Sequence, residues 1–214
     1  MLNRWLRKAW RSGCMVVLRR LFRRTRRHFI AALKNRDTKR RLAKVAATLI
    51  EDGDSLIIDC GSTTAYVAQA LCAHSDLHVI TNFAGIARTL APRNGNRVYV
   101  TDGELRADDA AVLGKAAVDF IQQFNVDYAV LSIGAVNKKN ELLDFYLCEA
   151  EFSRAAIQQA RQTCFVTDSS KFSKDALIKV CGLDQVDFVV TEGEPPAPFQ
   201  KACTENDTRL LISN

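Results

Sequence analysis

The chain has 214 residues, of which 48% are hydrophobic and 25% charged, the composition of an ordinary soluble protein that can bury a sizeable core in one domain. Its seven cysteines form no CxxC pair and no cluster with histidine at the spacing of metal ligands. We therefore expect reduced thiols, with neither a disulfide framework nor a metal site.

Charge is divided unevenly along the chain. Residues 1–36 contain ten Arg and two Lys without any Asp or Glu, which leaves 18 of the 30 basic residues against all 24 acidic ones in residues 37–214. We therefore expect a boundary near Asp37 between a basic N-terminal segment, 1–36, and an acidic body, 37–214.

Three functions are open for the basic segment, in which Trp5, Trp10, Phe22 and Phe29 lie among the arginines. Arginine with aromatic residues can grip nucleic-acid phosphates. The same composition suits an amphipathic helix on an anionic membrane or an organellar transit peptide. The longest uncharged run, Ser12 to Leu18, is too short to span a bilayer, so we expect no transmembrane helix.

From residue 37 onward the pattern is that of an α/β protein. Apolar residues at 42, 45, 46, 49 and 50 predict an amphipathic helix, with Asp37 as its N-cap and Gly53 just past its end. Short β-rich runs then occur at 56–60, 77–81, 97–101, 127–133, 163–168, 187–191 and 209–213. Helical stretches separate them at 64–73, 83–91, 114–124, 149–160 and 198–205. This alternation predicts an α/β fold, a mainly parallel sheet with flanking helices.

The first expected strand ends in Asp59 and is followed by the loop Gly61-Ser62-Thr63-Thr64. Ligands of open α/β sheets collect beyond the carboxyl ends of the strands. Here glycine lets the backbone approach an anion, the hydroxyls donate hydrogen bonds, and a helix N-terminus follows, so a phosphate would fit. Taken alone, the loop is explained as well by a Ser/Thr N-cap on a buried helix.

The other strand ends carry residues of the same kind: Thr81 and Asn82, then Gly103, Glu104 and Arg106, then Gly134, then Asp168, Ser170 and Lys171. Lysine can reach a phosphate as a point charge, and arginine can clamp it with two hydrogen bonds. Arg106 and Lys171 could equally be solvated surface charges. Together, the loops predict a site for an anionic, polyol-like ligand.

The order and spacing of these residues resemble the effector domain of the DeoR family of bacterial transcriptional regulators, over roughly residues 34–213. The motifs that carry the resemblance are D-x-G-S-T-T at 59–64, V-I-T-N at 79–82, G-E-x-R at 103–106 and T-D-x-S-K-F at 167–172. Within that family, residues 107–136 look most like the glycerol-3-phosphate regulon repressors.

The resemblance implies a fold related to ribose-5-phosphate isomerase and a sugar-phosphate-sensing domain over 37–214. It implies a cytoplasmic, homo-oligomeric, non-enzymatic repressor of carbohydrate or glycerol catabolic genes, without a cofactor and without membrane attachment. Such a repressor is released from operator DNA by a phosphorylated sugar or polyol, for which glycerol-3-phosphate is our best expectation. The implied effector-binding residues are Asp59, Gly61, Ser62, Thr63, Thr64, Thr81, Asn82, Gly103, Glu104, Arg106, Gly134, Asp168, Ser170 and Lys171.

The chain also departs from the family pattern. Cys60, Ser62 and Asp102 differ from the usual residues, and no string resembles the S-x-x-T-I-R-R-D of the family's recognition helix. We therefore interpret residues 1–36 as a degenerate or replaced DNA-binding region. One hypothesis is an out-of-frame translation, because codons for the family's R-V-H-G-G-A segment, shifted by one base, can encode the Cys-Met-Val-Val-Leu of residues 14–18.

Two other functions remain open at this point. One is a sugar-phosphate isomerase, with Glu104 as the base and with Asp59 and Lys171 in the pocket. The other is a decayed fragment of a repressor that folds without binding DNA.

Overall fold

The structure is a computed structural model that describes residues 35–172 and 174–213. The predictions for residues 1–34 of the basic segment lie outside the described residues. Seven strands form one sheet in the order β10-β9-β7-β4-β1-β2-β3, and every neighbouring pair in it is parallel. Their bounds are β1 (Ser55–Ile58), β2 (His78–Thr81), β3 (Arg97–Val100), β4 (Val126–Leu131), β7 (Ala160–Val166), β9 (Phe188–Glu192) and β10 (Arg209–Ser213). The predicted mainly parallel sheet is confirmed.

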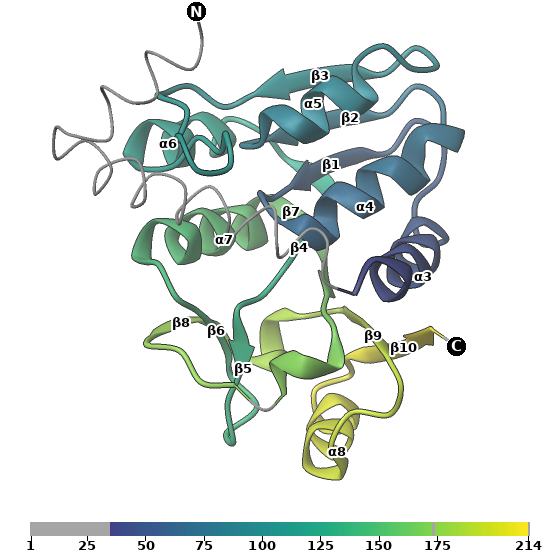
Figure 1. The fold of residues 1–214 in the computed structure, drawn as a ribbon, viewed down its shortest axis with the longest axis vertical. Helices are drawn as coiled ribbons and strands as arrows, with labels where there is room; N and C mark the ends of the chain where they lie inside the picture. The colour runs from purple at the N-terminus through teal and green to yellow at the C-terminus, as the bar shows by residue number, and fades with distance from the viewer. Residues whose placement is uncertain (1–34, 173, 214) are drawn as a thin grey trace, which may run out of the picture.

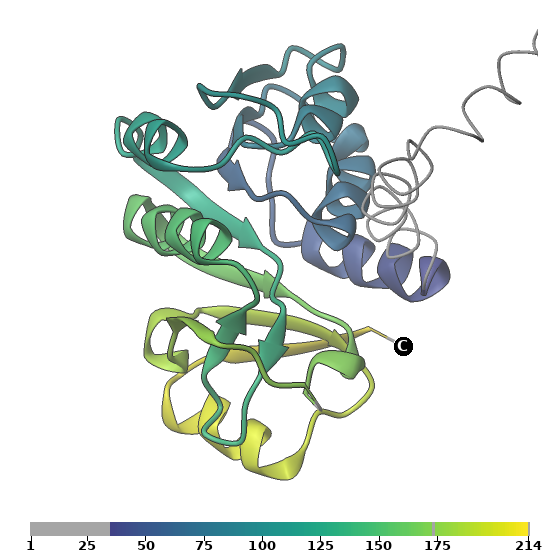
Figure 2. The ribbon, with the colours of Figure 1, turned by 60° about the vertical axis from the view of Figure 1, so that its left-hand side comes forward.

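Helices cover both faces of this sheet (Figures 1 and 2). One face is covered by α3 (Arg36–Ala47), α4 (Ser62–Ala70) and α5 (Ala84–Leu90), and the other by α6 (Lys115–Ile121), α7 (Leu147–Gln159) and α8 (Ala197–Glu205). Successive side chains of a strand point to opposite faces, so Leu56 and Ile58 enter the first core and Ile57 enters the second. Burial on both faces explains the uninterrupted apolar runs of the sequence.

Helix α3 differs from its prediction at its ends. It begins at Arg36, after Asn35 in the left-handed conformation (φ 58°), and ends at Ala47. The prediction of Asp37 as N-cap is wrong, because this residue lies inside the first turn, where its negative charge is favourable near the positive end of the helix dipole. Gly53 lies several residues beyond the end, in a turn with φ 89°.

A second sheet was not predicted from the sequence. Two of its strands come between β4 and α7 in the chain, and the third follows β7. It consists of β5 (Ala135–Val136), β6 (Leu142–Asp144) and β8 (Ile178–Cys181), paired antiparallel in the order β5-β6-β8. Strands of two to four residues are too short to show an alternating pattern. Figure 1 shows this small sheet beside the lower end of β4.

The strand order reverses between β1 and β4. From β1 the chain moves outward to β2 and β3, whereas from β4 it moves the other way to β7, β9 and β10. The loops that leave β1 and β4 therefore part in opposite directions and leave a crevice between them, the usual binding position in open α/β sheets. Among the described residues, no helix is long and apolar enough to cross a bilayer.

We expect Leu42→Ala to lower the free energy of unfolding by about 2–5 kcal/mol, because Leu42 is fully buried where α3 packs on the sheet. The exposed Lys44 of the same helix provides the control, and Lys44→Ala should change the stability by less than about 0.5 kcal/mol. Urea unfolding measures both. Equal, small effects would contradict the docking of α3 in the core.

Candidate functional site

A cavity of about 250 Å³ opens at the switch point between β1 and β4. The loops that follow β1, β2, β4, β6 and β7 line it, together with the first turns of α7. Half of the fourteen predicted effector-binding residues lie on its wall, and these are Asp59, Gly61, Ser62, Thr63, Asn82, Gly134 and Lys171. Loops far apart in the sequence thus meet around one polar hollow.

Asp59 and Ser132 join the two halves of the sheet at the cavity. The Oδ2 atom of Asp59 accepts hydrogen bonds from the backbone N–H of Ser132 at 2.9 Å and from its hydroxyl at 3.0 Å. The loops approach so closely that a Cβ atom at Gly61 would collide with the Ser132 hydroxyl, which is why glycine is required there. Burial raises the pKa of Asp59 to about 7, against the opposing effect of the bonds from Ser132.

Positive charge gathers at the first turn of α4, which Ser62 begins. Lys171, at the end of the 3-10 helix Ser169–Lys171, lines the cavity. Lys39 of α3 also contacts this turn, since its Nζ atom donates a hydrogen bond to Ser62 Oγ at 2.8 Å. The unpaired N–H groups of a helix start add to this positive potential, so the wall formed by Ser62, Thr63 and Lys171 is suited to an anion.

Asn82 supplies independent support for a polar ligand. Its side chain is fully buried and lies on the cavity wall, yet neither its Oδ1 nor its Nδ2 atom has a hydrogen-bond partner. Asp59 Oδ1 is likewise buried without a partner. Buried polar groups left unsatisfied cost about 1–3 kcal/mol each, so a wall of this kind favours a ligand with several hydrogen-bonding groups.

Acidic groups form another part of the wall. Burial, together with repulsion from Glu149, raises the pKa of Asp144 to about 7. Glu149 accepts a hydrogen bond from Arg106 at 2.6 Å, and Arg106 also pairs with Asp109. A carboxyl group with a pKa near 7, such as that of Asp144, can either accept or donate hydrogen bonds, which suits the hydroxyl groups of a polyol.

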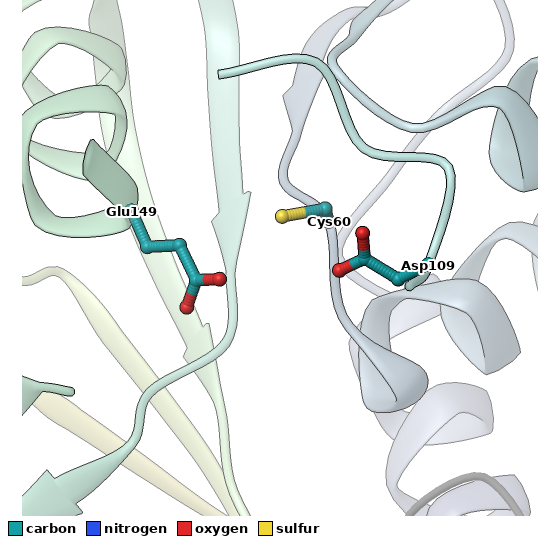
Figure 3. A group of neighbouring side chains, drawn as sticks. All are labelled: Cys60, Asp109 and Glu149. Carbon is teal, nitrogen blue, oxygen red and sulfur yellow. The ribbon is translucent and has the colours of Figure 1, made fainter. Parts of the chain in front are cut away.

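Cys60, Asp109 and Glu149 converge beside the cavity, with one potential metal-ligating atom from each within 4.8 Å of the others (Figure 3). Their chemistry fits a metal ion poorly. Arg106 pairs with both carboxylates, and burial, with further contributions from the acidic neighbours, raises the pKa of the Cys60 thiol. A cation would have to displace a guanidinium and bind a protonated thiol, whereas thiolate is the ligand form.

The other predicted residues lie off the wall, and five of them have local structural roles. The Thr64 hydroxyl donates to the backbone carbonyls of Asp59 and Gly61, which fixes the loop after β1. Thr81 Oγ1 accepts the N–H of Phe83. Gly103 adopts φ 138°, which residues with a side chain rarely adopt.

The loop after β7 is capped by its own side chains. Asp168 accepts hydrogen bonds from the backbone N–H and the hydroxyl of Ser170, and these bonds position the 3-10 helix that ends in Lys171. Glu104 is exposed outside the cavity. Arg106 does not line the cavity, but it donates a hydrogen bond to Glu149, which does.

The residues at or near the cavity that were not predicted include Lys39, Ser132, Asp144 and Glu149. A signal existed for Lys39, because it lies at i, with Leu42, Ala43 and Ala46 at i+3, i+4 and i+7, on the buried stripe of α3. A lysine on an apolar stripe is unusual enough to mark a special role. Asp144 gave no such signal, since the strand that carries it was not predicted.

A polar cavity at the switch point of an open α/β sheet defines a small-ligand-binding domain. The family profile described as the DeoR C terminal sensor domain matches residues 34–193. The chain therefore belongs to the DeoR family, and the predicted family resemblance is confirmed.

Curated relatives agree with this assignment. The chain is 35% identical over 176 residues to the glycerol-3-phosphate regulon repressor of Escherichia coli strain K12, covering 82% of this chain and 70% of the relative. It is 34% identical over 189 residues to the glycerol-3-phosphate regulon repressor of Haemophilus influenzae, covering 88% of this chain and 71% of the relative.

Solved structures are similar to this chain at low sequence identity, and the likeness to the first of them shows a shared fold. One is eIF2B delta from Chaetomium thermophilum, with a TM-score of 0.54 at 13% identity, over 72% of this chain and 54% of that one. Another is ribose 5-phosphate isomerase A from Methanocaldococcus jannaschii, with a TM-score of 0.46 at 17% identity, over 65% of this chain and 55% of that one. The chain spans about half the length of each of these structures.

The raised pKa of Asp59 predicts how stability depends on pH. Its pKa is about 7 in the folded state and about 4 in an unfolded chain, so the folded state binds the proton more tightly. The contribution of Asp59 to the free energy of unfolding is therefore fully present below about pH 4 and is lost as the pH rises through about 7. Between these values the free energy of unfolding falls by up to about 1.4 kcal/mol per pH unit.

Asp59→Asn keeps an oxygen for the bonds from Ser132 and removes the titration, so we expect a flatter decline in stability between about pH 5 and pH 8. The stability of the variant should still decline with pH, but less steeply than that of the wild type, because the pKa of Asp144 is also raised. Urea unfolding at several pH values measures the effect, with Asp102→Asn at an exposed position as control. An unchanged slope in Asp59→Asn would show that another group causes the decline.

Proposed function

We propose that this chain is the effector-sensing part of a DeoR-type transcriptional repressor and that its cavity binds a phosphorylated sugar or polyol, with glycerol-3-phosphate as the best candidate. Ligand occupancy then shifts the regulator between a form that binds operator DNA and a form that does not. We also propose that it acts as a homo-oligomer in the cytoplasm.

The observation that carries this proposal is the distribution of charge around the cavity. The first turn of α4 and Lys171 offer positive potential for a phosphate, while the amide of Asn82 and the carboxyls of Asp59 and Asp144 offer partners for hydroxyl groups. The volume of about 250 Å³ lies just below the usual range of ligand pockets, about 300–1,000 Å³, and therefore favours a small ester over a nucleotide.

An isomerase is less consistent with the geometry. Abstraction of a proton next to a carbonyl requires a carboxylate within hydrogen-bond reach of the substrate. Glu104, the candidate base, is exposed and does not line the cavity. Asp59 does line it, but Ser132 holds its Oδ2 atom, so only Oδ1 is left for a substrate. The relatives named as repressors also favour a regulator.

Binding of glycerol-3-phosphate should raise the unfolding temperature of the full chain, by an amount that corresponds to about 2.7 kcal/mol at a ligand concentration a hundred times the Kd. Lys171→Met should weaken binding about 10- to 100-fold, because it removes a charged partner of the phosphate. Thermal-shift titration yields both Kd values.

Lys174→Met is the matched control, since Lys174 is exposed and lies in the same loop but not on this cavity. Unphosphorylated glycerol tests whether the phosphate is needed. Equal Kd values for wild type and Lys171→Met would contradict the assignment of the phosphate position. The absence of any shift with a panel of phosphate monoesters would contradict the proposed function itself.

A further inference from the structure

Lys39 is a buried cation in an otherwise apolar part of α3. Only 4% of its surface is exposed, although lysine is among the residues least often buried. Burial lowers its pKa, and the nearby positive charge of Lys171 acts in the same direction, while Asp168 opposes the change. A buried ammonium group is unfavourable unless nearby negative charge and hydrogen bonds compensate for its burial, and Asp168 supplies part of this compensation.

The contact that Lys39 makes points to an anion. Its Nζ atom donates to Ser62 Oγ at 2.8 Å and so engages a lone pair of that hydroxyl. The hydroxyl hydrogen then remains available to donate to another group, and Ser62 lies on the cavity wall. Lys39 itself does not line the cavity, so it acts through Ser62 and through its positive charge.

The three groups that surround this position come from separate elements. Lys39 belongs to α3, Ser62 begins α4, and Lys171 ends the 3-10 helix after β7. Lys171 repels Lys39 here and Asp168 attracts it, and an anion bound at Ser62 would add to that attraction. The unsatisfied and fully buried amide of Asn82 on the same wall independently indicates a ligand.

We propose that Lys39 is the positioning residue through which a phosphate in the cavity holds α3 against α4, so that effector occupancy is transmitted to the helix that follows residues 1–34. This inference rests on the proposed function, because it requires a phosphorylated ligand. An occupied cavity lowers the free energy of the arrangement in which α3 is docked, and by linkage a docked α3 raises the affinity for the ligand.

The experiment compares the full chain with Lys39→Met and with Lys44→Met. Methionine keeps most of the length and apolar stem of lysine and removes the charge, and Lys44 is an exposed lysine of the same helix. Thermal-shift titrations use glycerol-3-phosphate and inorganic phosphate as probes. Hydrogen exchange of the α3 amides is followed with and without saturating glycerol-3-phosphate.

For Lys39→Met without ligand we expect an unfolding temperature equal to or above that of the wild type, because a buried charge has been removed. Its Kd for both probes should rise about 10- to 100-fold, and glycerol-3-phosphate should no longer slow the exchange of α3. Wild type and Lys44→Met should keep the tight Kd and the slowed exchange.

Other results would overturn the proposal. A merely structural role for Lys39 predicts a lower unfolding temperature with an unchanged Kd. An unchanged Kd together with ligand-slowed exchange in Lys39→Met would refute the transmission through this residue, while the proposed function would stand. If the wild type responds to neither probe nor to other phosphate monoesters, the proposed function fails and this inference fails with it.

Discussion

The site depends on the junction between β1 and β4, where Ser132 donates two hydrogen bonds to one oxygen of Asp59. The strand order reverses at this junction, so the loops on either side separate and leave room for a ligand. The same closeness excludes a side chain at Gly61 and removes Asp59 from water, which raises its pKa to about 7. The position of the cavity, the need for glycine and the titration of the carboxyl therefore have one origin.

The cavity combines groups that a stable core would normally avoid. Lys39 is buried against the hydroxyl of Ser62, the amide of Asn82 has no partner, and Asp144 lies close enough to Glu149 for repulsion to raise its pKa. Each feature costs free energy when the domain folds. The proposed ligand, with a phosphate at one end and hydroxyl groups along its chain, would interact with all of these groups and so recover part of that free energy on binding.

Much of the fold could be predicted from the sequence, because strands buried on both faces give continuous apolar runs followed by Gly, Ser, Thr or Asn. The small antiparallel sheet could not be predicted, because strands of two to four residues are too short to show an alternating pattern. Asp144, which ends one of these strands, was therefore not predicted either. Among the loop residues, sequence does not reveal whether a hydroxyl faces a ligand or its own backbone. Thr63 lies on the wall, whereas the neighbouring Thr64 bonds to carbonyls of the loop. Arg106 is bound by Glu149, 43 residues away, a pairing that only the fold creates.

Transmission from the cavity requires an element that both senses the ligand and changes something beyond it, because a ligand shifts an equilibrium only by its difference in affinity for the two states. The loops after β1 and β7 are fixed by Asp59–Ser132 and by the Asp168–Ser170 cap, so they have little freedom to respond. Helix α3 is different. The bond from Lys39 to Ser62 links it to the cavity wall, and its first turn follows the N-terminal segment in sequence. A ligand that strengthens this bond would stabilise the docked position of α3. This helix is the described element nearest in sequence to the region where the family resemblance places DNA binding.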